Sequence, residues 1–192
     1  MRKIFMLAIM IACAAPAAFA QDDYNKYDVY VGYSHNRVDI GVSDDDPDVD
    51  DIVDEREGFH GIEFSAKGAL SRYVGLKGDY AYHRKSFNAF GANVDANLHT
   101  LVGGVEFKDN SKETKVKPFA HAMIGVGHAN VEVEDFDFDQ SETGLAGVIG
   151  GGIDFRVSER VDFRAIQFDW NPARGGGQTT HNFRIGIGIV FR

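Results

Sequence analysis

Apolar residues alternate with small or polar residues along the last twelve positions of the chain. The apolar side chains that share one parity are Phe183, Ile185, Ile187, Ile189 and Phe191. Because successive side chains of a strand point to opposite faces, this segment is predicted to be a strand with one purely apolar face. A strand of a soluble sandwich alternates in the same way, so this segment alone does not decide between water and lipid.

Seven earlier segments repeat the pattern, at residues 26–37, 58–70, 73–83, 98–107, 116–128, 144–155 and 161–170. In the seventh of them the parity changes, because Val161 and Phe163 fit one phase whereas Ile166 and Phe168 fit the other. One extra residue near Arg164–Ala165 would restore the alternation, so we predict a β-bulge there. With the last strand the total is eight, an even number that is typical of transmembrane barrels.

The predicted connections alternate between long and short. The long ones are residues 38–57, 84–97, 129–143 and 171–180, and the short ones are residues 71–72, 108–115 and 156–160. Outer-membrane barrels have long external loops and short periplasmic turns, so both ends of the barrel are expected on the periplasmic side. The predicted fold is therefore an all-β, eight-stranded antiparallel up-and-down transmembrane β-barrel.

Residues 1–20 are predicted to be a cleaved secretory signal peptide that precedes a barrel domain at residues 21–192. The chain begins with Arg2 and Lys3, continues with an apolar run, and reaches an A-x-A cleavage site at Ala18-Phe19-Ala20. A lipid-modified Cys13 is an alternative, although the residues before it fit that reading poorly. With cleavage after Ala20 no cysteine is left, so neither disulfides nor thiol chemistry are expected.

The charge of the chain is strongly negative. Without Arg2 and Lys3 there are 18 basic and 29 acidic residues, a formal charge of −11. Such a surface repels nucleic acid, and no basic patch offsets it. No stretch after the signal holds about 18 consecutive apolar residues, so no transmembrane helix is predicted.

Several segments together make the chain similar to a known group. They are the signal peptide, residues 28–34 (DVYVGYS), 73–80 (YVGLKGDY), 118–122 (PFAHA) and 164–170 (RAIQFDW), and the final alternating strand. In these segments the chain resembles small outer-membrane β-barrel proteins of the OmpA/OmpX-like and opacity-protein type. The resemblance implies the cell outer membrane as location, and outer-membrane lipid, lipopolysaccharide and the barrel-assembly machinery as partners. That machinery recognises an aromatic residue at the end of the last strand, and here Phe191 is followed by Arg192.

Charged residues of the inward parity are predicted to form a structural network in the lumen. They are Glu63, Lys67, Lys77, Asp79, Glu106, Lys117, Asp154 and Arg184, four acidic and four basic residues. An eight-stranded barrel has an interior that side chains can just fill, and buried charges are costly unless they are paired. The sequence therefore favours a salt-bridged plug over a narrow small-solute channel, and a wide porin would need about 16 strands.

Seven histidines are the candidates for catalysis: His35, His60, His83, His99, His121, His128 and His181. Ser34 directly precedes His35, but no spacing indicates a hydroxyl activated by a base that a third group orients. We expect the histidines near the outer strand ends, which include His83, to lie in the polar interface belt. His121 is expected inside the lumen. No enzyme activity and no cofactor are predicted, with an outer-membrane lipid-modifying enzyme as one alternative.

The acidic segments are the remaining functional feature. Nine acidic residues and one arginine lie between residues 44 and 57, and six acidic residues lie between residues 130 and 143. Calcium prefers such oxygen ligands, but the EF-hand spacing is missing, so metal binding stays open. The leading hypothesis is a structural, non-enzymatic barrel whose acidic external loops form an interaction or adhesion surface. Its external partner is unknown, and a soluble lipocalin-like barrel with an apolar interior is the rival fold.

Overall fold

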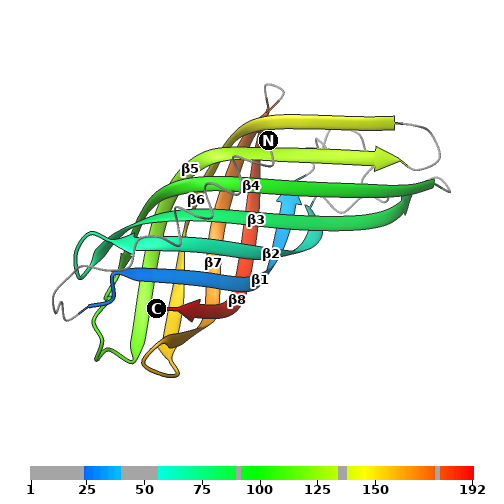
Figure 1. Ribbon diagram of the computed structural model, residues 1–192. Coiled ribbons are helices and arrows are strands. Elements are labelled where there is room, and N and C mark those ends of the chain that lie inside the picture. The colour runs from blue at the N-terminus through cyan, green and yellow to red at the C-terminus, as the bar shows by residue number, and fades with distance from the viewer. Residues whose placement is uncertain (1–23, 40–55, 90–91, 134–137, 176–177) are drawn as a thin grey trace, which may run out of the picture.

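Eight antiparallel strands form a closed barrel in the computed structural model of the chain (Figure 1). The structure describes residues 24–39, 56–89, 92–133, 138–175 and 178–192. The strands are β1 (Tyr27–Asp39), β2 (Arg56–Ala69), β3 (Val74–Ala89), β4 (Ala92–Lys108), β5 (Val116–Val133), β6 (Phe138–Arg156), β7 (Val161–Gly175) and β8 (Gln178–Phe191). Each strand pairs with the next, and β1 pairs with β8 to close the sheet. The predicted eight-stranded up-and-down barrel is confirmed.

The apolar parity of the strands faces outward and the polar parity faces inward. Ile62, Leu101 and Ile124 are 62%, 57% and 63% exposed. On β5 the exposed apolar face runs from Val116 to Val126, which is about 24 Å at a tilt of about 45°. That height matches the lipid-facing band of a transmembrane barrel. The apolar face lies outside and charged side chains lie within, so the soluble lipocalin-like alternative is excluded. No helix in the described ranges is long and apolar enough to cross a bilayer.

The β-bulge predicted in the seventh strand is present. The pairing of β7 with β8 shifts between Arg164 and Gln167, and the pairing of β6 with β7 shifts between Ile153 and Asp154. Because of the extra residue, the side chains of Arg164 and Gln167 are both buried in the lumen although they differ in parity.

Two glycines shape the seam at which the barrel closes. Gly32 of β1 lies directly opposite Gly188 of β8. A Cβ atom on Gly32 would overlap with the hydroxyl of Tyr30, and one on Gly188 would lie 2.8 Å from the ring of Tyr30. Only glycine therefore leaves room for the Tyr30 ring to lie across the inner side of the seam.

The strands are longer than the sequence predicts at one edge of the barrel. Only residues 90–91 separate β3 from β4, residues 134–137 separate β5 from β6, and residues 176–177 separate β7 from β8. The predicted loops at 84–97, 129–143 and 171–180 are therefore wrong for most of their length. Beyond the bilayer both faces of a strand meet water, so the apolar alternation that identifies a strand disappears there. The long connection at residues 40–55 lies outside the described residues.

The two edges of the barrel differ, which sets its orientation. Residues 70–73, 109–115 and 157–160 connect strands at the edge where β1 begins and β8 ends. At the other edge β3 to β6, with 16 to 19 residues each, extend beyond the 13 residues of β1 (Figure 1). Short turns are periplasmic and longer extensions external in outer-membrane barrels, so we assign the extended edge to the outside.

A pair at the periplasmic edge gives a pH-dependent prediction. The Arg72 guanidinium donates to Asp109 over 3.0 Å, and together with donors from Ser111 and Thr114 it lowers the pKa of the Asp109 carboxyl to about 2. Because the ordinary value is about 3.9, the carboxylate should stabilise the fold above about pH 4, and this stabilisation should vanish as the pH falls through about 2.

The expected size is below about 1 kcal/mol, since the pair is exposed to water. The measurement is the difference in the free energy of unfolding between the native protein and Asp109→Asn, determined at pH 5 and at pH 2. The difference should shrink toward zero at the lower pH. A difference that grows as the pH falls would contradict the assignment.

Candidate functional site

The lumen is the candidate functional site, because charged side chains from every strand meet there. Within the described part of the chain, seven carboxylates and seven cationic groups are buried in it. The acidic residues are Asp28, Glu63, Asp79, Glu106, Asp154, Asp162 and Asp169, and the basic ones are Lys67, Lys77, Lys108, Lys117, Arg164, Arg184 and Arg192. The two sets balance, as a buried charge set must when the desolvation of each ion is costly.

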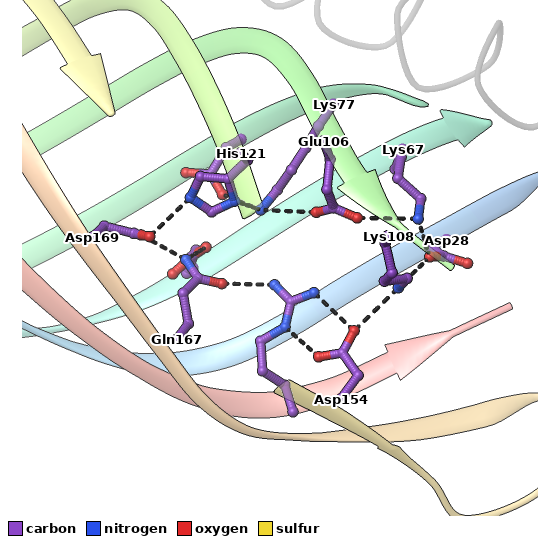
Figure 2. Close-up of polar contacts among 12 residues, drawn as sticks. Asp28, Lys67, Lys77, Glu106, Lys108, His121, Asp154, Gln167 and Asp169 are labelled. Carbon is purple, nitrogen blue, oxygen red and sulfur yellow. Dashed lines mark hydrogen bonds and ion pairs between the residues drawn. The ribbon is translucent and has the colours of Figure 1, made fainter. Parts of the chain in front are cut away.

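A closed ring of ten side chains runs around the interior (Figure 2). In order the ring contains Lys67, Asp28, Lys108, Asp154, Arg164, Gln167, Asp169, His121, Lys77 and Glu106, which returns to Lys67. Its ten contacts measure 2.6 to 3.7 Å. The members come from β1 to β7, so a slip of any of these strands by one residue would remove a member from the ring.

Arg184 connects the remaining strand, β8, to this ring. Its guanidinium lies 2.7 Å from Asp169, 3.1 Å from Asp79 and 3.6 Å from Glu63. Gln167 links the same groups, because its amide nitrogen donates to Glu63 over 2.8 Å and to Asp169 over 2.7 Å. One cation therefore faces three carboxylates, all fully buried.

Arg164 occupies the middle of the lumen between two aromatic rings. Its guanidinium carbon is 4.0 Å from the centre of the Phe119 ring and 4.3 Å from that of Tyr30. It also donates to both oxygens of Asp154, over 2.8 and 3.2 Å. Ring and guanidinium are in van der Waals contact on both sides, so no water fits between them. At this level the lumen is filled by side chains.

The two ends of the lumen differ from this middle layer. At the periplasmic end Asp162 lies 3.3 Å from Lys117 and 2.9 Å from Arg192. Toward the outside a small apolar cluster covers the ring, and it contains Val102, Met123, Ala146 and Val148. Beside it Ser34 Oγ and His83 Nε2 lie 2.8 Å apart, both buried.

The structure buries all eight charged residues that the sequence assigns to the lumen. These are Glu63, Lys67, Lys77, Asp79, Glu106, Lys117, Asp154 and Arg184. Four of them lie in the ring: Lys67, Lys77, Glu106 and Asp154. Glu63, Asp79 and Arg184 form the cluster beside the ring, whereas Lys117 pairs separately with Asp162.

The sequence reasoning missed several members of the network. Asp28 carries the inward parity of its strand and could have been included on that ground. Lys108 was placed in a turn, which is wrong, because it is the last residue of β4 and its ammonium lies 2.6 Å from Asp28. Arg164 and Asp169 stand on opposite sides of the bulge, so parity alone cannot assign both to the lumen.

The histidines divide between the two faces of the barrel. His83 and His121 are buried inside the barrel. The expectation that His83 lies in the interface belt is therefore wrong, and the expectation that His121 lies inside the lumen is confirmed. The outward-facing histidines are His35, His60, His99, His128 and His181, according to the strand alternation. In the described ranges no group of three or more histidine, cysteine or acidic residues could hold a metal ion. The acidic run at residues 44–51 lies outside these ranges.

A closed barrel of eight strands with a lipid-facing apolar band and a charged interior defines a small outer-membrane barrel protein. The sequence agrees with this class, because residues 5–191 match the outer membrane protein β-barrel domain family. The chain belongs to that family, and its location is the cell outer membrane. A comparison with curated proteins gives no significant match.

Solved structures share the fold at low sequence identity. Ail, the attachment invasion locus protein of Yersinia pestis, is 17% identical, with a TM-score of 0.57 over 88% of this chain and 99% of its own. Neisserial surface protein A is 13% identical, with a TM-score of 0.63 over 88% and 99%. A second structure of Ail contains the heparin analogue sucrose octasulfate, with 17% identity and a TM-score of 0.57 over 86% and 98%.

Proposed function

We propose that the protein is a structural, non-enzymatic outer-membrane barrel whose acidic external segments form an interaction surface. The observation that carries this proposal is the closed ring of ten side chains, which connects seven strands through the middle of the lumen. A buried ion pair adds little net stability compared with apolar packing, so the role of the network is to specify strand register. With the lumen filled, the external segments are the part that can meet a partner.

The charge of those segments indicates the kind of partner. Residues 44–57 carry nine acidic residues and one arginine, and the whole chain has a formal charge of −9. The Ail structure with sucrose octasulfate holds a polyanion. A sulfated ligand would be repelled by the acidic segments of this chain, so complementarity favours a cationic partner surface.

The test uses intact cells that display the barrel and a polylysine-coated surface. Replacing the acidic residues of 44–57 by asparagine and glutamine should reduce adhesion several-fold at low salt, where the Debye length is long. The matched control neutralises Glu113 and Glu159 in the periplasmic turns, which should leave adhesion unchanged. Equal adhesion of wild type and the loop variant would contradict the proposed surface.

A narrow channel for small solutes is the second candidate. It is favoured by the charged side chains that occupy the lumen from Asp162 at one end to Arg184 nearer the other. Against it stands Arg164, which is in contact with aromatic rings on two sides. Conductance separates the two candidates.

An outer-membrane lipid-modifying enzyme has less support. Ser34 and His83 are hydrogen-bonded, but both side chains are buried, and Nδ1 of His83 has no hydrogen-bond partner among the described residues. A serine nucleophile needs access to its substrate and a third group that orients the base. The arrangement fits a packing role for the pair.

The proposed partners in the envelope are lipopolysaccharide and the barrel-assembly machinery. The last strand presents Phe191 outward at its end, half exposed, as the aromatic signal for assembly. Arg192 behind it is held by Asp162 over 2.9 Å and donates to the carbonyl of Ser158 over 3.0 Å. The terminal charge is therefore turned inward, away from the lipid-facing aromatic residue.

A further inference from the structure

Three successive pairs of polar residues face each other across β4 and β5 on the outer face of the barrel. The pairs are His99 with His128, Asn97 with Asn130, and Asp95 with Glu132. They span about 14 Å along the strands. With Ile62, Tyr80, Tyr82 and Arg84 they line a groove of about 630 Å³.

Neighbouring hydroxyl groups hold three of the four residues in the first two pairs, His99, His128 and Asn97. The Tyr80 hydroxyl lies 2.9 Å from Nδ1 of His99, and the Thr143 hydroxyl lies 2.8 Å from Nδ1 of His128. Tyr82 donates to the side-chain oxygen of Asn97 over 2.8 Å, and its ring centre is 4.8 Å from that of His99. The Nε2 atoms of both imidazoles and the amide nitrogen of Asn97 are thus the atoms available to a ligand.

One feature of the groove is unfavourable without a ligand. Asp95 and Glu132 are carboxylates directly opposite each other, an arrangement that destabilises a sheet. Arg84 donates to Asp95 over 2.8 Å and Ser86 donates to its other oxygen, so Glu132 is the carboxylate that a ligand would meet. A ligand rich in hydrogen-bond donors would supply Glu132 with partners.

The charge of the groove selects the chemistry of that ligand. Asp95 and Glu132 outweigh Arg84 in formal charge, so the groove favours the hydroxyl groups of a headgroup over its phosphates. Carboxylates accept hydrogen bonds from hydroxyl groups, and the Asn97 amide donates to them. Aromatic rings beside such groups give an apolar surface with oriented polar atoms, which suits a sugar ring.

The position of the groove indicates that the sugar is attached to a lipid. Directly below the imidazole pair on the same face are Leu101 of β4 and Val126 of β5, both exposed at the upper end of the apolar band. Acyl chains would lie against these residues while the headgroup enters the groove. We propose that the groove formed by β3, β4 and β5 binds the sugar headgroup of a glycolipid of the outer leaflet. This proposal rests on the lipopolysaccharide contact proposed above, and it assigns that contact to one place on the barrel.

The test is native mass spectrometry of the intact barrel after its release from nanodiscs. The nanodiscs contain phosphatidylglycerol and an equal amount of lipopolysaccharide that lacks O-antigen. Wild type should retain the glycolipid in about tenfold excess, which corresponds to about 1.4 kcal/mol. Glu132→Leu, which removes the carboxylate that a ligand would meet, should bring the ratio close to one. Tyr82→Phe, which releases Asn97, should lower it several-fold.

The matched control is His181→Ala. His181 also lies on the outer face toward the external edge, stacked 5.7 Å from Trp170, but it belongs to β8 and lies outside the groove. It should leave the ratio unchanged, and the gel shift on boiling should show that every variant is folded. Retention of the glycolipid by wild type and variants alike would overturn the groove but keep lipopolysaccharide as partner. Equal retention of both lipids by wild type, or retention that EDTA abolishes, would overturn both the groove and the direct contact.

Discussion

Replacing Arg184 by leucine is expected to destabilise the barrel by about 3–5 kcal/mol, because it leaves buried carboxylates without their cation. The guanidinium faces Asp169, Asp79 and Glu63 within 2.7 to 3.6 Å, and all four side chains are fully buried. Arg184→Lys retains a charge but loses the second hydrogen bond to Asp169, so its loss should be smaller.

The measurement is urea unfolding of the barrel refolded into lipid vesicles, followed by the shift in gel mobility between folded and boiled protein. The matched control is Arg72→Leu, which removes an exposed arginine from its pair with Asp109 and should cost at most about 1 kcal/mol. Equal stability of Arg184→Leu and wild type would show that the carboxylates do not depend on this cation.

The second large effect is expected on the lipid-facing side. Ile149 is exposed and pairs with Ala122, near the middle of the apolar band on β5. Ile149→Arg should cost roughly 2–4 kcal/mol, since this is the price of a basic side chain at the midplane of the bilayer.

Val157→Arg is the control for that substitution. Val157 is 68% exposed in the periplasmic turn at residues 157–160, where an arginine meets water and headgroups. The same unfolding experiment should find this variant within about 1 kcal/mol of wild type. If both arginine variants were equally stable, the band would not be in contact with hydrocarbon.

Parity along the strands predicted the fold and a large part of the lumen. Inside and outside alternate strictly in a barrel, so Lys77 and Arg184 could be assigned to the interior from the sequence alone. The partners within the lumen could not be assigned, because contacts such as that of Gln167 with Glu63 connect strands that are not neighbours. Those contacts depend on how the barrel closes, which leaves no local pattern in the sequence, whereas the bulge in β7 does leave one in the change of parity.

The external part of the strands could not be predicted for a different reason. Residues 92–97 and 129–133 are strand although they carry no lipid-facing alternation. Their outer face bears Asn97 and Asn130, polar residues that in isolation indicate loops. Only the pairing of β4 with β5 shows that they lie opposite each other and form a groove.

Conductance across a planar lipid bilayer tests the proposed plug most directly. Folded wild-type protein, shown to be inserted by its gel shift on boiling, should give no discrete current steps, because Arg164 and the ring of ion pairs fill the middle of the lumen. Regular open steps from the wild-type barrel would contradict the structural role of the network and establish the narrow channel in its place.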